Sequence, residues 1–251
     1  MIDVYLLTAS VIGWFLLLIV IKWKWSLTTD SASYAVAFVH GIFTTRATEY
    51  IMYTDGIWNA EQFGGPVTPL QAVIITMSAG YFLYDIWICF KTGEPLVIKC
   101  HHVLATTIFA TTLWAGRSGP EVVVCLWCGE FTNVFLNLRF FFQNYKGGEQ
   151  FRNSVIPFLN DALFVIGFAV MRFGVGSYAI YHILFGGRSL EILKICCIGF
   201  TAVNLYMGKM IAGEVAKMVS SMLSKKKGSS PSLSSQIDSQ PLVTTARQHQ
   251  E

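Results

Sequence analysis

The chain has 251 residues, of which 53% are hydrophobic and only 13% are charged, and its formal net charge is +3. Because a soluble domain is about a quarter charged, this composition excludes an ordinary soluble protein and is typical of a polytopic membrane protein. The sequence has no GxxxxGK[ST] phosphate loop and no basic stripe with interleaved aromatic residues. Nucleotide and nucleic-acid binding are therefore not expected.

Seven apolar segments are long enough to cross a bilayer, which takes a helix of about 20 residues. The predicted spans are residues 4–21, 33–53, 68–90, 97–116, 120–142, 155–179 and 192–214. Turn-forming stretches such as "TGEP", "RSGPE" and "YKGGEQ" separate them. Gly174 and Gly176 predict that the sixth helix is kinked, broken or longer than its span.

The chain divides into three parts by composition. Residues 1–29 are predicted to be a transmembrane anchor, because the first span lacks an A-x-A-like cleavage site. Residues 30–215 hold the other six spans and are predicted to form one domain. Residues 216–251 are rich in Ser, Gln and Lys and are predicted to be a disordered tail.

Positive charges predict the orientation of the chain in its membrane. The loops on the side of the C-terminus carry most of them: Lys22, Lys24, Lys91, Lys99, Lys146, Arg152 and Lys225–Lys227. The loops on the other side carry only Arg117, Arg188 and Lys194. This asymmetry predicts a cytosolic C-terminus and an odd number of spans. The membrane itself stays open among the endoplasmic reticulum, another internal membrane and the plasma membrane.

Two adjacent histidines begin the fourth span. Ionisable groups inside a span are costly unless they face the interior of the bundle, and they mark function by default. Neighbouring helical side chains diverge by about 100°, so one of His101 and His102 can face a cavity while a neighbouring helix holds the other. Asp85 lies at the same depth on the third span, so we expect it to contact a histidine. The alternative role for the pair is a structural hydrogen bond between helices, worth about 0.6 kcal/mol.

Glu130, Asn133 and Asn137 follow the spacing i, i+3 and i+7, which places them on one face of the fifth helix. This face suggests an interior filled by water or a ligand. His40 remains open between a structural and a functional role, and Arg172 is expected to be structural or interfacial.

Other polar pairs point to structure rather than function. Arg46 and Glu49 are expected to neutralise each other. The six cysteines are expected to be small buried hydrophobic residues. Cys125 and Cys128 lack the two further ligands that zinc needs, so no metal site is predicted.

Three functions are compatible with this polar interior. A neutral imidazole can accept a proton during acyl transfer to a lipid, or can itself carry the acyl group. The same residues can instead bind a lipid headgroup without turnover. Proton-coupled transport is the weakest reading, because no inverted repeat is visible.

The segments "GYFLYDIWICF", "HHVLATT" and "GEFTNVFLNLRFFF", in this order, resemble the core of the TLC domain family, which includes ceramide synthases. The resemblance covers about residues 30–215 and implies six helices around a cavity, preceded by one further helix. His101 and His102 match the catalytic histidine pair of ceramide synthases, and Tyr84 and Asp85 match a tyrosine and an aspartate of the preceding helix.

The resemblance is incomplete on the fifth span. Ceramide synthases carry an HD-x-x-D pattern there, whereas this chain reads "CGEFTN", with Glu130 and Asn133 in place of the aspartates. Ceramide synthesis by that machinery is therefore not predicted.

The sequence thus predicts an all-α polytopic membrane protein with seven transmembrane helices, six of them forming a TLC-type bundle around a polar cavity. We expect a non-catalytic regulator of lipid composition that binds a membrane lipid in this cavity. The alternative is a histidine-dependent lipid acyltransferase with acyl-CoA as donor and no other cofactor, and whether the protein is an enzyme stays open. Its partners are membrane lipids, and a homo-oligomer is also allowed. The candidate catalytic residues are His101, His102 and Asp85, and the candidate binding residues are Glu130, Asn133, Asn137, His40 and Tyr84.

Overall fold

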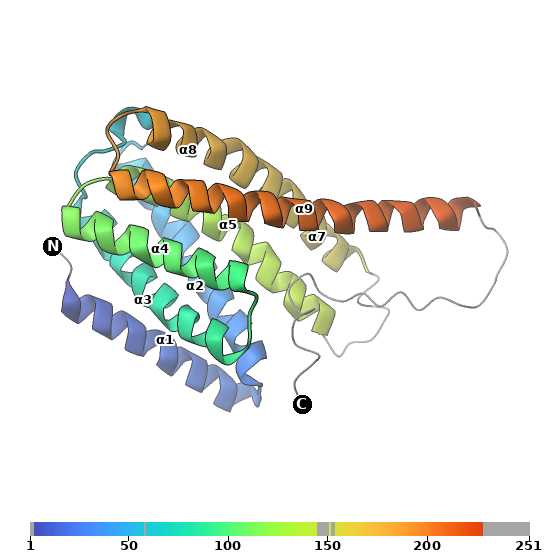
Figure 1. The fold of residues 1–251 in the computed structure, drawn as a ribbon. Coiled ribbons are helices and arrows are strands. Elements are labelled where there is room, and N and C mark those ends of the chain that lie inside the picture. The colour runs from blue at the N-terminus through green and yellow to red at the C-terminus, as the bar shows by residue number, and fades with distance from the viewer. Residues whose placement is uncertain (1–2, 58, 145–150, 152–153, 228–251) are drawn as a thin grey trace.

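The computed structural model describes residues 3–57, 59–144, 151 and 154–227, and within these residues the chain is helical and has no β-strand. Figure 1 shows the helices side by side in one bundle, with α9 continuing past the others. The elements are α1 (Val4–Trp25), α2 (Thr29–Thr54), η1 (Ala60–Gln62), α3 (Pro69–Lys91), α4 (Leu96–Ala115), α5 (Gly119–Asn144), α7 (Val155–Phe168), η2 (Ala169–Val175), α8 (Gly176–Phe185) and α9 (Glu191–Lys227).

The seven predicted spans correspond to seven helical runs in the described residues, because α7, η2 and α8 form one run from Val155 to Phe185. Six of the runs are long and apolar enough to cross a membrane. The seventh, α2, is not among these six, and it carries Asp30, Arg46 and Glu49. It packs most extensively against α5 (Figure 1).

Local sequence explains where the helices begin and end. The Thr68 side chain accepts a hydrogen bond from the backbone N–H of Gln71, whose side chain accepts one from the backbone N–H of Thr68. This reciprocal capping box, followed by Pro69, starts α3. At the end of α4, Gly116 adopts a φ of +65°, a left-handed conformation that glycine takes without strain.

Three loops are tied together at the end of the bundle that carries residues 55–57, 59–68, 116–118 and 186–190. The backbone N–H of Gly64 donates to both carboxylate oxygens of the buried Glu121, at 3.0 Å each. The N–H of Ser118 donates to the Gly65 carbonyl at 2.7 Å, and its hydroxyl accepts from the N–H of Leu190 at 3.2 Å. These bonds satisfy backbone groups that would otherwise be buried without partners.

The sixth predicted helix is continuous and longer than its predicted span. Its irregularity is the π-helical turn η2, in which the N–H of Gly176 donates to the carbonyl of Met171, five residues earlier. A π turn changes the register of the helix faces and is common at functional sites. Arg172 lies within this turn.

The predicted tail begins inside α9. This helix continues to Lys227, whereas the sequence predicted disorder from residue 216. Composition misplaced the boundary because no glycine or proline lies between Gly213 and Gly228, so nothing in this stretch stops the helix. Residues 228–251, the rest of the predicted tail, lie outside the described residues.

Candidate functional site

Two adjoining cavities lie inside the bundle. The first, of about 90 Å³, has mostly apolar walls that include Phe109, Leu126 and Cys197, and we call it the apolar cavity. The second, of about 170 Å³, is lined by polar groups as well as apolar ones and is called the polar cavity. Both cavities share the junction residues His101, Asn133, Arg172 and Asn204.

The expected contact between Asp85 and the histidine pair is confirmed. Nε2 of His102 lies 3.2 Å from Oδ2 of Asp85, and each side chain is only 13% exposed. The His101 ring diverges from its neighbour and packs edge-on against Phe200 of α9, with the two ring centroids 5.0 Å apart. As a result His102 lines only the polar cavity, whereas His101 lines both cavities.

The polar face predicted on α5 is present in the structure. Asn133 donates from Nδ2 to Oε1 of Glu130 at 3.3 Å, and Asn137 donates to the Asn133 carbonyl at 2.7 Å. Glu130 lines the apolar cavity, Asn137 the polar cavity and Asn133 both. Oε2 of Glu130 also lies 3.3 Å from Nδ1 of His40, which connects α5 to α2.

Two of the predicted binding residues line neither cavity. His40 is 1% exposed and stacks on Tyr81 with the ring centroids 3.7 Å apart. Tyr84 is fully buried and packs edge-on against Phe15 of α1, with a centroid distance of 5.0 Å. The geometry therefore gives no support to direct substrate contact by His40 or Tyr84. The sequence could not place them, because it does not say which faces α1 covers.

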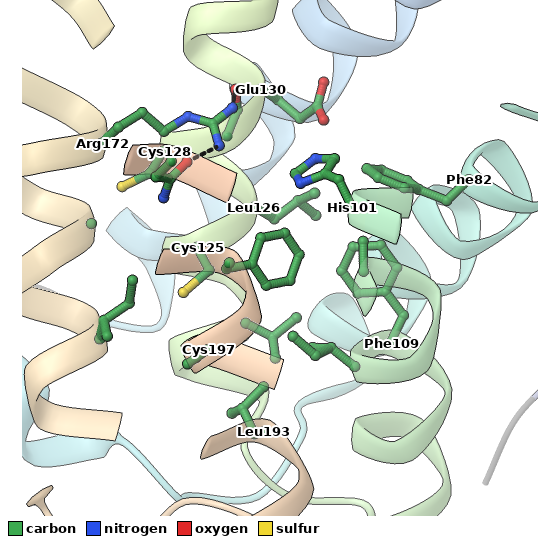
Figure 2. A pocket seen from close by; sticks show the side chains of 18 of the residues that line it. Phe82, His101, Phe109, Cys125, Leu126, Cys128, Glu130, Arg172, Leu193 and Cys197 are labelled. Atoms are coloured by element: carbon green, nitrogen blue, oxygen red, sulfur yellow. Dashed lines mark hydrogen bonds between the residues drawn. The ribbon is translucent and has the colours of Figure 1, made fainter. Parts of the chain in front are cut away.

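Sequence reasoning underestimated Arg172. Its guanidinium donates from Nη2 to the carbonyl of Gly129 at 3.0 Å and from Nη1 to Oδ1 of Asn204 at 3.3 Å. Figure 2 draws dashed hydrogen bonds from the labelled Arg172 side chain. Nε donates to the hydroxyl of Thr132 at 3.3 Å. Figure 2 also places Arg172 at the same end of the apolar cavity as Glu130. The signal that could have found it is an arginine in the middle of an apolar span with no acidic residue within one turn.

Two further ion pairs involve arginine side chains. The self-neutralising pair of Arg46 and Glu49 is confirmed, with Nη2 and Oε1 2.9 Å apart. Arg139 of α5 has its Nε 3.7 Å from Oδ1 of Asp161 on α7, a contact between helices that the sequence alone does not predict.

One cluster offers ligands of the kind that bind metal ions. Asp85, Cys89 and His102 each place one ligand atom within 4.8 Å of the others. Three such ligands and an open position would suit a catalytic Zn²⁺. The absence of a metal site stays a prediction, and metal analysis of the purified protein tests it.

Six membrane-length helices define this chain as a multi-pass integral membrane protein. The family model described as "TLC domain" matches residues 4–212. The chain therefore belongs to the TLC domain family, which is consistent with a lipid-related membrane function.

A curated relative supports this assignment. TLC domain-containing protein 4 C of Dictyostelium discoideum is 28% identical over 120 residues, which cover 45% of this chain and 42% of the relative. This chain thus spans less than half of the relative that it matches.

Proposed function

We propose that this protein binds a membrane lipid inside its bundle and acts in lipid homeostasis as a non-catalytic regulator of membrane lipid composition. The observation that carries the proposal is the pair of cavities, one polar and one apolar, that meet at shared walls. A lipid has the same division into a polar head and an apolar chain. The head would occupy the polar cavity, and a chain would enter the apolar cavity.

The selectivity for one lipid over another would come from the polar cavity. Burying a methylene group from water contributes about 0.8 kcal/mol, but a lipid chain in a bilayer is already out of water. Moving it into the apolar cavity therefore contributes little. Hydrogen bonds between the headgroup and polar side chains such as Asn133, Asn137 and His102 would decide which lipid binds.

Within the family, "TPLQ" at 68–71, "SGPEV" at 118–122 and "RFGVG" at 172–176 resemble TLC domain-containing protein 5 most. The proposal therefore includes membership of this chain in the subgroup of TLC domain-containing protein 5. Its relatives are associated with membrane phospholipid composition rather than with one agreed reaction. We also propose that the C-terminus is cytosolic, because most of the positive charges lie in the loops on its side of the membrane.

A second candidate function is lipid acyl transfer, favoured by the contact between Asp85 and His102. Asp85 would fix the tautomer of His102 and stabilise its charged form. An imidazole of the pair would take the proton of a lipid hydroxyl or amine while that group attacks the thioester of acyl-CoA. The new ester or amide bond forms, the C–S bond breaks, and the proton leaves with the thiol.

Comparative lipidomics of cells that lack the protein tests the first proposal. We expect wild type to restore the lipid profile and the double variant His101→Ala, His102→Ala to fail, because both rings line the polar cavity. The matched control is His182→Ala, since His182 lies on α8 and lines neither cavity. Full rescue by a correctly folded double variant would rule out both a role for the pair in binding and catalysis by it.

Mass spectrometry of the purified protein separates the two functions. Binding predicts a lipid adduct that dissociates on denaturation. Acyl transfer through an imidazole predicts acyl mass that stays on His101 or His102 after denaturation, or transfer from acyl-CoA to an added lipid. Either of the latter results would replace the binding proposal with the enzymatic one.

A further inference from the structure

We infer that Arg172 recognises the oxyanion of the bound lipid and that this lipid is a phospholipid. The inference rests on the proposed lipid site and names its ligand class. It starts from a charged group in the middle of a predominantly apolar run, Val155–Phe185. A cation in such a place needs a counter-charge or a polar surrounding.

The protein partners of the guanidinium are all neutral. A guanidinium has five N–H donors, and the three bonds of Arg172 go to a carbonyl, an amide oxygen and a hydroxyl. Among the residues that the structure describes, no carboxylate forms an ion pair with Arg172. Two N–H groups and the positive charge are thus left for another partner. Oxyanions bind a guanidinium through paired hydrogen bonds, which suits these two donors.

Glu130 is the acidic residue that lines the apolar cavity together with Arg172, but its oxygens have other partners. Oε2 lies 3.3 Å from Nδ1 of His40, and Oε1 accepts from Asn133 at 3.3 Å. These contacts hold the carboxylate on the α2 side of α5. Glu130 therefore attracts the guanidinium without occupying its free donors.

The position of Arg172 favours a phosphate over a terminal carboxylate. Arg172 is a junction residue that lines both cavities. A lipid with its oxyanion there has its chain in the apolar cavity. A fatty acid would end at this point and leave the polar cavity of about 170 Å³ without a lipid group. A phospholipid continues beyond its phosphate and can place its headgroup in the polar cavity.

The other wall of the polar cavity is acidic. Asp85 and Glu94 line it together with Tyr34, and none of these residues lines the apolar cavity. Carboxylates repel a phosphate, so the phosphate lies at the Arg172 end. The headgroup beyond it meets hydrogen-bond acceptors, which suits an amine or a hydroxyl group.

A binding assay with the full-length protein in detergent tests this inference. The probes are phosphatidylcholine, phosphatidylethanolamine, diacylglycerol with the same chains, ceramide and oleic acid, each scored by native mass spectrometry. For wild type we expect the two phospholipids to bind at least about tenfold more tightly than diacylglycerol or ceramide. Arg172→Gln should remove this preference and leave diacylglycerol binding unchanged.

Two variants serve as controls. Arg172→Lys keeps the charge but loses the paired geometry, so it should retain part of the preference. Arg139→Gln also removes one arginine from a membrane helix, but Arg139 lines neither cavity, and the preference should persist.

The outcomes separate the two proposals. Equal affinity of wild type for phosphatidylcholine and diacylglycerol, or binding of oleic acid alone, would overturn the role of Arg172 while lipid binding stands. Absence of any bound lipid would overturn the proposed function itself. Since the preference is measured on wild type, the inference can fail even where Arg172→Gln does not fold.

Discussion

Asp85 can act on His102 in two ways, and one substitution separates them. In Asp85→Asn the amide oxygen can still accept a hydrogen bond from Nε2 of His102, which lies 3.2 Å from the carboxylate. Under the binding proposal, lipid affinity should therefore change by no more than about tenfold. Under acyl transfer the rate should fall by a factor of up to about 10⁴, because Asn can favour the unreactive imidazole tautomer and cannot stabilise the imidazolium. Affinity and acyl transfer measured on the same preparation decide between them.

Glu94 makes the stability of the protein depend on pH. It lies in the loop between α3 and α4, where burial and the charge of Asp85 raise its pKa to about 7, against an opposing effect of Lys99. The folded-state pKa is above the unfolded value of about 4.3, so this contribution to stability is fully present below about pH 4. It is lost as the pH rises through about 7.

We therefore expect wild type to lose stability relative to Glu94→Gln between about pH 5 and about pH 8, by roughly 1 kcal/mol, because the side chain is partly exposed and screened. Thermal unfolding of both proteins in detergent over this range measures the difference. Parallel pH profiles for the two proteins would contradict the assignment.

Residue-level prediction succeeded where helical spacing decides the outcome. Glu130, Asn133 and Asn137 share a face because of their spacing, and adjacent His101 and His102 diverge for the same reason. Prediction from the sequence failed where the orientation of a side chain depends on an irregular turn. The π turn η2 shifts the register of its helix, so spacing alone could not aim Arg172 at the cavities.

At the scale of elements, α1 is held to the bundle by close packing around Gly80 of α3. The Ser10 hydroxyl donates to the carbonyl of Met77 at 2.8 Å, and Nε1 of Trp14 donates to Ser10 at 3.1 Å. A Cβ atom added at Gly80 would lie 2.6 Å from Cβ of Ser10 and 3.1 Å from the backbone nitrogen of Val11. Only glycine lets the two helices approach so closely, as at other small-residue membrane interfaces.

Gly80→Ala should therefore lower the free energy of unfolding by about 1–3 kcal/mol, the usual cost of overpacking. Gly13→Ala is the matched control on α1 itself, since a Cβ there meets nothing within 4 Å. It should be neutral or slightly stabilising, because alanine favours helix. Unfolding midpoints of both variants in the same detergent measure the effect. Equal midpoints would show that α1 does not depend on this contact.

The spans were predictable as elements because apolar length and turn residues act locally. Thr68, Pro69 and Gly116 mark helix ends in the sequence just as they do in the structure. The end of α9 was not predictable, because the composition becomes polar before the helix ends. The covering of α3 by α1 depends on glycine packing between distant segments, which no local pattern reports.

For the whole molecule, the two ends of the bundle differ. One end is closed by hydrogen bonds among three loops, including those from Glu121 and Ser118. The other end carries the start of α2 and the loop before α4, where Tyr34 and Glu94 line the polar cavity. Most of the lysines used to predict orientation flank the helices at this second end. A cytosolic position for it would let headgroups enter from the cytosolic leaflet.

This topology depends on α2, the helical run that is not among the six long and apolar enough to cross a membrane. If α2 spans the membrane with the six other runs, the count is odd and the two termini lie on opposite sides; if it does not, they lie on the same side. We expect the odd count with a cytosolic C-terminus. A glycosylation sequon fused before Met1 should therefore be modified in cells, and the same sequon fused after Glu251 should not. Gel shifts with and without glycosidase read both sites. Modification of both fusions would exclude an odd number of spans, and modification of the C-terminal fusion alone would reverse the orientation and place the polar cavity on the non-cytosolic side.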